Sequence, residues 1–224
     1  MVSCRSQILI TGAAILLSLA FFGDPSQASE APLITKLRNA AAQILESAQI
    51  SYVYGGSSIG SAKECKLCND CLDRLKPSPK ERFEKCKDCY SCSLDCSHFV
   101  QRVFSDAGIH FPYLTTDTMR QTPPNILLKR YGLIDLGRDV RRSIAGDLLV
   151  YKGHVVLLEK VHKPGIGDIV HATGGRDIKG PGEGIQRERH VKLASFRGPL
   201  MRILRHQSLY LHKMRKIRTS KFNK

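Results

Sequence analysis

Apolar residues recur at helical spacing from Leu33 to Gln49, and their steps of three and four residues place them on one face of an amphipathic helix. The next stretch, ISYVYGGSS (residues 50–58), contains the β-favouring residues of a short extended segment and ends in a Gly-Gly turn. The sequence therefore predicts a helix followed by a short strand. The apolar positions of the helix are Leu33, Leu37, Ala40, Ala41, Ile44, Leu45 and Ala48.

A second helical pattern begins after Asp95, whose side chain can cap the first turn, and it ends at Gly108, a usual helix terminator. Cys96 falls in that first turn, where free backbone N–H groups and the helix dipole favour an anion. We therefore expect the thiolate of Cys96 to be stabilised, as in reactive cysteines. The apolar face of this helix is Phe99, Val100, Val103, Phe104 and Ala107.

Two apolar segments late in the chain predict strands. Residues 145–161 (AGDLLVYKGHVVLLEKV) and 167–175 (GDIVHATGG) are rich in branched aliphatic residues, and a Pro-Gly loop separates them. Before them, Thr116 can cap a shorter helix that Pro123–Pro124 would stop. The glycine-rich residues 174–184 predict a hairpin connection.

Residues 62–92 differ sharply in composition from their surroundings. They are charged and rich in cysteine, with two prolines near the centre and almost no aliphatic pattern. A segment of this kind cannot bury a core of its own without crosslinks. It predicts an insertion held together by its six cysteines: Cys65, Cys68, Cys71, Cys86, Cys89 and Cys92.

The first 28 residues predict a secretory signal peptide. A positive charge at Arg5 precedes an uncharged apolar run from Ile8 to Phe22, and small residues up to Ala28 offer a cleavage site. A membrane anchor would need about 18 to 20 apolar residues, and this run is shorter and is interrupted by Thr11–Gly12. We therefore expect an exported protein of the periplasm or cell envelope.

The chain is strongly basic, with a formal net charge of +15. Eight Lys or Arg residues from Arg202 onward face no acidic residue and predict a basic C-terminal tail over residues 201–224. In an exported protein such a tail meets anionic lipid headgroups or cell-wall polymers rather than nucleic acid. A solvated terminus without any partner is the equally open alternative.

The last four cysteines of the chain stand at C-x2-C-x2-C-x3-C, the spacing of a bacterial ferredoxin loop. They are Cys86, Cys89, Cys92 and Cys96. Export argues against a cluster, and Ser97 replaces the proline that normally follows the fourth cysteine, Cys96. The six cysteines of the insertion make an even set without Cys96, and three disulfides are the default for such a set in an oxidising compartment. A structural zinc is the alternative, because two subsets of four have spacings close to those of zinc ribbons.

A nucleophilic cysteine needs a base within hydrogen-bond reach and a third group that orients the base. Of the eight histidines, His154 and His171 lie on predicted core strands, in GHVVLLE and IVHATGG. Neighbouring strands could hold one imidazole against Cys96 and the other behind it. From the residues alone, a packed or surface role for either histidine is equally open.

Four segments resemble, in this order, the blocks of the NlpC/P60 family of cell-wall cysteine peptidases: YVYGGSS, DCSHFVQRVFSDAGI, GDLLVYKGHVVLLE and DIVHATGG. The resemblance spans roughly residues 44–175 without the insertion. It implies an α+β, papain-like fold, with N-terminal helices packed on an antiparallel sheet and the cysteine-rich insertion before the nucleophile helix. The implied organisation is a signal peptide (1–28), a catalytic domain (29–200) and the basic tail (201–224).

The resemblance also implies roles for individual residues. Cys96 would be the nucleophile, His154 the general base and then acid, and His171 the residue that orients His154. The implied reaction is hydrolysis of amide bonds in peptidoglycan stem peptides, in particular the γ-D-glutamyl to diamino-acid bond, with no cofactor required. The alternative is a catalytically inactive module of the same fold that binds the wall or a metal ion. The intact cysteine and histidines favour the enzyme.

Further residues near the nucleophile are expected to contact the substrate. By the same resemblance, Tyr52 would contribute near the oxyanion site, and Asp95 and Ser97 would help to recognise the free amino end of the stem peptide. Two positions depart from the family pattern, because His98 and Val156 replace smaller residues. Both add bulk beside the cleft, which predicts a narrowed or altered specificity.

Overall fold

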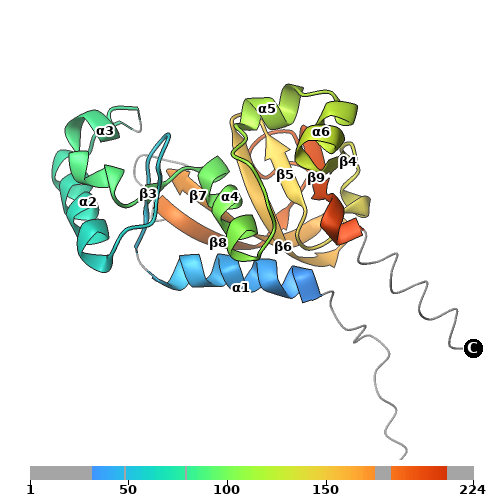
Figure 1. Cartoon of the computed structure of the whole chain (residues 1–224), viewed down its shortest axis with the longest axis horizontal. Helices are drawn as coiled ribbons and strands as arrows, with labels where there is room; N and C mark the ends of the chain where they lie inside the picture. Colours follow the sequence, from blue (N-terminus) through green and yellow to red (C-terminus); the bar gives the residue numbers. More distant parts are fainter. Residues whose placement is uncertain (1–31, 48, 79, 175–182, 211–224) are drawn as a thin grey trace, which may run out of the picture.

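The computed structural model describes residues 32–47, 49–78, 80–174 and 183–210. The predicted signal peptide lies outside this part of the chain, as does most of the predicted basic tail. Figure 1 shows a twisted sheet with helices along it and a lobe of short helices at one end. The protein therefore has an α+β fold in which N-terminal helices pack on an antiparallel sheet, as predicted.

Helices α1 and α4 carry the apolar faces that the sequence predicts. Leu37 and Ile44 of α1 join Phe99 and Val103 of α4 in one buried cluster, so the two helices pack together over the sheet. Among the described helices, none combines the length and the apolar character that crossing a membrane requires. The α-helices are α1 Pro32–Ser47, α2 Ala62–Leu75, α3 Arg82–Lys85, α4 Cys96–Asp106, α5 Thr116–Gln121 and α6 Pro124–Tyr131.

The main sheet has six strands in the order β4-β9-β5-β6-β7-β8, and every neighbouring pair is antiparallel. Strands β5 to β8 follow one another in both sequence and space, whereas β9 inserts between β4 and β5. The strands are β4 Leu133–Asp135, β5 Leu148–Tyr151, β6 His154–Lys163, β7 Ile166–Gly174, β8 Glu183–Lys192 and β9 Arg202–His206.

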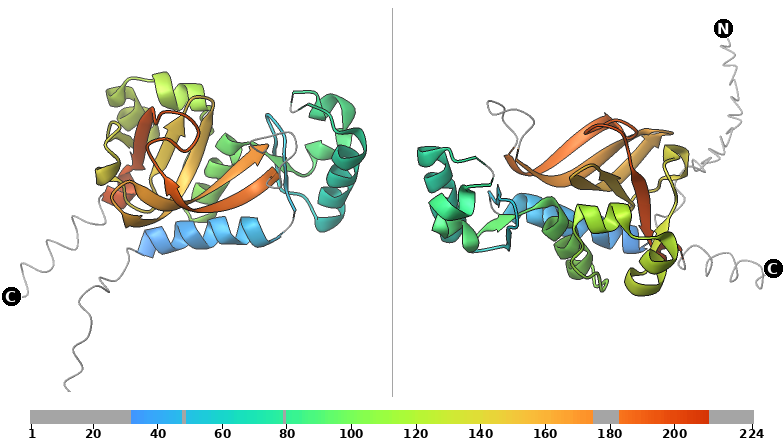
Figure 2. Two further views of the ribbon diagram at one scale, coloured as in Figure 1. Left: turned by 180° about the vertical axis from the view of Figure 1, so that it is seen from behind. Right: turned by 90° about the horizontal axis from the view of Figure 1, so that it is seen from above.

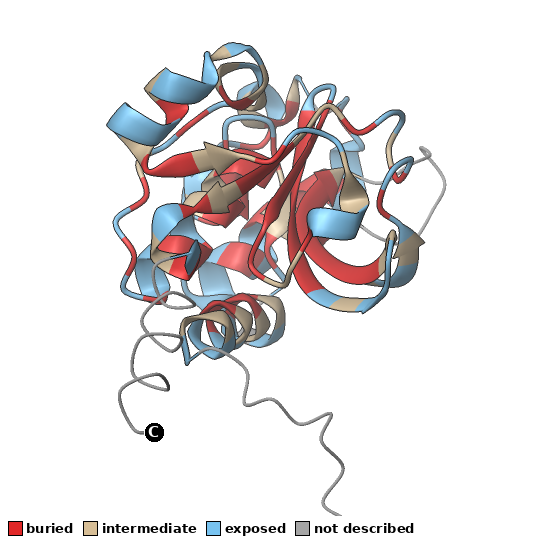
Figure 3. Ribbon diagram, turned by 90° about the vertical axis from the view of Figure 1, so that its right-hand side faces the viewer, coloured by how far each residue is buried: buried red, intermediate tan, exposed pale blue. Residues whose placement is uncertain are grey.

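Both faces of the central strands are buried (Figure 3). Val155 and Leu157 of β6 point into the cluster shared with α1 and α4. Their neighbours Val156 and Leu158 point into a second cluster on the opposite face, which Phe196 helps to close. Because side chains alternate along a strand, burial on both faces requires the continuous aliphatic run that marks β6 in the sequence.

The lobe at the end of the molecule is the cysteine-rich insertion (Figure 2). It consists of α2, α3 and a 3₁₀ helix, η1 (Lys87–Tyr90). The lobe is joined to the core by a small sheet in which β3 (Ser93–Leu94) pairs in parallel with β1 (Ser51–Tyr52) and antiparallel with β2 (Ser57–Ser58). This sheet leads directly into α4.

Three nested disulfides hold the lobe together. They join Cys65 to Cys92, Cys68 to Cys89 and Cys71 to Cys86. The last two disulfides make most of a separate buried cluster with Val53 and Leu72, whereas Cys65 and Cys92 belong to the main core cluster. The predicted crosslinks therefore take the form of disulfides, and Cys96 is left as the free cysteine of the described residues.

The prediction of two late strands was incomplete. Residues 145–161 form a hairpin of two strands, β5 and β6, because Lys152–Gly153 make a two-residue turn that pairs Tyr151 with His154. Gly153 has φ +71, which a tight hairpin turn of this kind requires. Strands β7 and β8 pair antiparallel on either side of residues 175–182, which agrees with the predicted hairpin connection.

The predicted boundary of the basic tail at residue 201 was wrong. Residues Arg202–His206 form β9 in the middle of the sheet, and their charges are neutralised locally. Arg202 forms an ion pair with Asp135, and Arg205 with the fully buried Asp147. The pattern of charges could not reveal these partners, because they lie some 60 residues earlier in the chain.

Candidate active site

Cys96 is the first residue of α4, and the chain reaches it through β3. The amide of Asp95 donates to the carbonyl of Gly56 at 2.9 Å, which fixes the entry to the helix. The Asp95 carboxylate then caps the helix by accepting from the amide of His98 at 2.7 Å. Cys96 is consequently held in one orientation in the first turn, with only 5% of its surface exposed.

His154 and His171 lie side by side on the adjacent strands β6 and β7. The Nε2 atom of His154 is 2.7 Å from Nδ1 of His171, and Nε2 of His171 is 3.2 Å from a carboxylate oxygen of Glu188 on β8. His171 is fully buried and packs edge-on against the ring of Phe196, at 5.3 Å between centroids. Three neighbouring strands thus supply a hydrogen-bonded His-His-Glu chain.

Helix α4 packs on β6 and β7, which brings Cys96 to the beginning of β6. The Cys96 sulfur interacts with the backbone of Val155, the residue that follows His154. The structure therefore brings together all three residues that the sequence proposed as nucleophile, base and orienting group.

The protonation of this pair differs from the expectation. Burial raises the pKa of the Cys96 thiol to about 11, and the adjacent carboxylate of Asp95 adds to the effect. Burial also lowers the pKa of His154 well below its usual value, with further lowering by His171 and Arg197. The predicted stabilisation of the thiolate by the helix start was wrong for the resting site, because desolvation outweighs it. The resting pair is a neutral thiol beside a neutral imidazole.

Three tyrosines gather around the nucleophile. Tyr52 on β1 is close enough to Cys96 and Asp95 for their charges to act on it, and burial is the main cause of its raised pKa. Tyr113 also has a raised pKa, mainly from burial, with contributions from Asp95, Cys96 and Tyr54. Tyr54 is 71% exposed and Tyr113 is 41% exposed, so aromatic surface is available to a ligand beside Cys96.

The predicted substrate contacts Asp95 and Ser97 both flank Cys96 and are buried. Asp95 is already engaged, since it also accepts from the amide of Gly55 at 3.2 Å and lies 3.1 Å from Nδ1 of His98. The Ser97 hydroxyl interacts with the Cys96 sulfur. Val156, which replaces a smaller residue of the family pattern, points into the second core cluster and away from α4. The prediction that it narrows the cleft was therefore wrong.

His98 forms a wall of the site. Its ring stacks on Tyr113 with 4.0 Å between centroids and an interplanar angle of 16°. This stack, together with the contact to Asp95, fixes the position of a bulky side chain two residues from the nucleophile.

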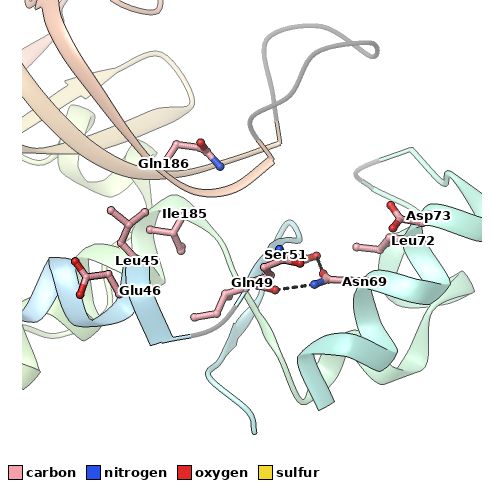
Figure 4. Close-up of a pocket in the computed structure, with 10 residues that line it drawn as sticks. Leu45, Glu46, Gln49, Ser51, Asn69, Leu72, Asp73, Ile185 and Gln186 are labelled. Atoms are coloured by element: carbon pink, nitrogen blue, oxygen red, sulfur yellow. Dashed lines mark hydrogen bonds between the residues drawn. The ribbon is translucent and has the colours of Figure 1, made fainter. Parts of the chain in front are cut away.

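A separate cavity of about 550 Å³ lies where the lobe meets the core. Figure 4 shows residues of α1, α2 and β8 around it, with Asn69 bridging the lobe to the strand β1. The Asn69 amide donates to the carbonyl of Gln49 at 2.8 Å, and its oxygen accepts from the hydroxyl of Ser51. None of the predicted catalytic residues lines this cavity.

Sequence reasoning missed Glu188 and Tyr113. The segment around Glu188, EGIQRERHVK, consists of polar and charged residues with few apolar ones, so it lacks the apolar pattern that would predict a strand. Its partnership with His171 depends on the pairing of β7 with β8, which no local pattern reveals. Tyr113 lies in the loop after α4 and contacts the site through its stack on His98.

No protein-family model and no curated protein matches this chain. Solved structures resemble it at low identity. The peptidoglycan hydrolase RipB from Mycobacterium tuberculosis is 18% identical over 82% of this chain and 72% of that chain, with a TM-score of 0.44. The P60 domain of an antigen from M. avium paratuberculosis is 13% identical over 78% of this chain and 96% of that chain, with a TM-score of 0.41.

A lipoprotein-like protein of the NLP/P60 family from Staphylococcus aureus is 18% identical over 79% of this chain, with a TM-score of 0.40. This chain spans 42% of that protein's length.

Proposed function

We propose that the protein is an exported cysteine peptidase that hydrolyses amide bonds in peptidoglycan stem peptides, with the γ-D-glutamyl to diamino-acid bond as the expected target. The observation that supports this best is the hydrogen-bonded chain His154-His171-Glu188 behind Cys96, the free cysteine of the described residues, at a helix start. Nucleophile, base and orienting group in this arrangement are the requirements of thiol-based acyl transfer.

In the proposed mechanism, neutral His154 accepts the proton of Cys96 as the sulfur attacks the amide carbonyl. The imidazolium that forms is stabilised by its hydrogen bond to His171, and His171 is in turn polarised by its hydrogen bond to the Glu188 carboxylate. The same proton then goes to the leaving amine. Water, activated by the regenerated neutral His154, hydrolyses the thioester and frees Cys96. The raised pKa of Cys96 and the lowered pKa of His154 suit proton transfer during attack rather than a preformed ion pair.

The developing oxyanion is stabilised by donors at the start of α4. The first amides of a helix have no partner within the helix, so the Cys96 amide can donate to it. The phenol of Tyr52 is the second donor, because its raised pKa keeps it protonated. Each such donor contributes about 2.7 to 4 kcal/mol to catalysis in comparable sites. The reaction needs no cofactor.

Support for a stem-peptide substrate comes from the resemblance of the motif blocks to cell-wall peptidases. The Asp95 carboxylate is suited to a free amino group, and the aromatic surface of Tyr54 and Tyr113 is suited to the apolar face of a short peptide. The disulfides agree with an extracytoplasmic location, where both oxidising conditions and peptidoglycan occur.

The proposal is tested by incubating purified sacculi with the wild-type chain and with Cys96→Ala. Wild type should release new free amino groups and fragments of stem peptides, and Cys96→Ala should release none while still binding sacculi. If wild type binds but never cleaves, the inactive wall-binding module is correct instead.

A further inference from the structure

A cluster of two histidines and an aspartate lies outside the candidate active site, on three consecutive strands. His162 is on β6, Asp168 on β7 and His190 on β8. Nε2 of His162 is 2.7 Å from Oδ1 of Asp168, and Nδ1 of His190 is 4.0 Å from the same oxygen. The two imidazole rings are stacked, with 4.1 Å between centroids and an angle of 7°.

The backbone departs from regular pairing at each of these residues. Shifts of register occur between Val161 and Lys163 and between Gly167 and Ile169, on either side of His162 and Asp168. His190 has φ +53, a left-handed conformation that few residues other than glycine adopt. This conformation lets the His190 amide donate to Asp168 at 2.9 Å. Three irregularities therefore converge on one carboxylate, and such strain is often stored at binding sites.

The three side chains offer a donor set that suits a metal ion. One candidate atom from each residue lies within 4.8 Å of the others. Ligand atoms on a tetrahedral zinc ion are about 3.3 to 3.6 Å apart, given metal–ligand distances of about 2.0 to 2.2 Å. The Asp168 side chain is only 12% exposed and is fixed, whereas that of His190 is 69% exposed and can turn inward by the small distance required.

We propose that His162, Asp168 and His190 bind a divalent transition-metal ion of the zinc type. Neutral imidazole and carboxylate are ligands that this class of ion prefers over calcium or magnesium, and water would complete the coordination. An extracytoplasmic protein meets such ions directly, without metal delivery inside the cell. The neighbouring Lys160, Lys163 and Lys192 oppose a cation, which predicts moderate affinity.

The bound ion would act on structure and not on the reaction. Asp168 lies three residues before His171 on β7, and His190 lies two residues after Glu188 on β8. An ion that joins β6, β7 and β8 would therefore pin the strands that carry the His171–Glu188 pair. This inference does not depend on the proposed peptidase activity, because metal binding is measured directly.

The test is calorimetric titration of Zn²⁺ into the oxidised chain without the predicted signal peptide, which contains Cys4, and with Cys96→Ser as the background so that no thiol competes for the ion. One equivalent should bind with a Kd in the low micromolar range, and Co²⁺ at the site should give visible absorption. His162→Gln and His190→Asn should each weaken binding at least ten-fold. Asparagine suits position 190 because it tolerates a left-handed backbone.

The matched control is His110→Gln, an exposed histidine outside the cluster, which should leave the Kd unchanged. Circular dichroism without metal should show that every variant is folded. If His190→Asn does not fold, His162→Gln alone tests the site. Absence of saturable binding, or equal affinity in wild type and the cluster variants, would overturn the proposal and leave a His-Asp-His ion-pair cluster.

Discussion

The Nε2 atom of His154 lies 2.7 Å from the Nδ1 atom of His171, so one of the two nitrogens must carry the shared proton. The other ring nitrogen of His154 is Nδ1, and the next residue along β6, Val155, is the one whose backbone interacts with the Cys96 sulfur. Since Nε2 of His171 approaches the carboxylate of Glu188, that nitrogen donates and Nδ1 of His171 accepts. Nε2 of His154 is therefore protonated, and its Nδ1 is the unprotonated atom that a general base requires.

This chain of contacts predicts a graded loss of activity. His154→Ala should lower kcat/KM by about 10²- to 10⁴-fold, because the general base is removed. His171→Ala should cost less, since it orients and polarises the base without contacting the substrate. Glu188→Gln should cost least, because the carboxylate is 32% exposed and its contact with His171 is 3.2 Å long.

These losses are measured as kcat/KM on a soluble stem peptide, with thermal unfolding of each variant as the check on folding. His110→Ala serves as the matched control and should behave like wild type. Unchanged activity in His154→Ala, or a larger loss in Glu188→Gln than in His154→Ala, would contradict the assignment.

The protonation states predict the dependence of labelling on pH. Iodoacetamide reacts with the thiolate, and the pKa of Cys96 is about 11 in the folded protein. The labelling rate should therefore rise about ten-fold per pH unit from pH 7 to pH 10, with no plateau near neutrality. A rate that levels off below pH 7 would indicate a preformed thiolate-imidazolium pair instead.

The activity should have its acid limb below the ordinary histidine pKa of 6.5. Catalysis needs neutral His154, and burial lowers the pKa of this imidazole, so protonation sets in only at a pH below 6.5. The profile of kcat/KM against pH should thus stay flat from pH 8 down to 6.5. A decline that is half complete at pH 7 would show that the base is not the buried His154.

Replacing His98 should alter substrate binding more than turnover. His98→Ala removes the imidazole whose Nδ1 lies 3.1 Å from Asp95 and so opens one side of the carboxylate to the amino end of a peptide, while the backbone amides of residues 55 and 98 still donate to it. KM for a stem peptide with a free amino end should fall several-fold, with little change in kcat. Tyr113→Phe keeps the ring that stacks on His98 and is the control. An unchanged or higher KM in His98→Ala would exclude this competition.

The fold was predictable wherever an apolar pattern matched an element. The helix of Leu37 and the helix of Phe99 follow the 3.6-residue period closely, and both were predicted to within two residues. Helix α2 was missed because three of its four buried positions are cysteines, among them Cys65 and Cys68, which appeared as crosslinks in the sequence rather than as a helix face. Strand β9 was missed because the partners of its arginines are distant in sequence.

The residues of the candidate site were predictable from the sequence, but their pKa values were not. Cys96, His154 and His171 stand in recognisable motifs, and a capped helix start predicts where the thiol lies. The raised pKa of Cys96 depends on how completely α4 and β6 exclude water, a property of packing that local sequence does not encode. Glu188 was not predicted because the pairing of β7 with β8 brings it to His171, and this pairing is likewise not encoded in the local sequence.

The innermost and outermost disulfides should differ in their effect on the active site. Cys92 lies four residues before Cys96 and directly precedes β3, so the Cys65–Cys92 bond anchors the segment that leads to the nucleophile. Replacing this pair by alanines should lower kcat/KM several-fold at a temperature where the protein is still folded. The Cys71–Cys86 pair does not adjoin β3, because six residues separate Cys86 from Ser93, and its removal is the matched control with kcat/KM near wild type. Equal losses in the two double variants would show that the lobe does not position Cys96.

The basic C-terminal segment should bind anionic surfaces without taking part in the reaction. Arg202 and Arg205 are paired with Asp135 and Asp147, so of the eight basic residues from position 202 onward six remain, between residues 213 and 224. Each basic residue near an anionic membrane surface contributes about 1 kcal/mol to binding at physiological salt.

Deleting residues 213–224 should weaken binding to vesicles of anionic lipid at least ten-fold at low salt. Above a few tenths molar salt, where screening dominates, the deletion should change binding little. Because the deletion begins after β9, kcat/KM on a soluble stem peptide should be unchanged. A full-length variant with glutamine at the six basic positions separates charge from length and should lose binding equally. Retained binding in that variant would mean that the surface is recognised elsewhere on the molecule.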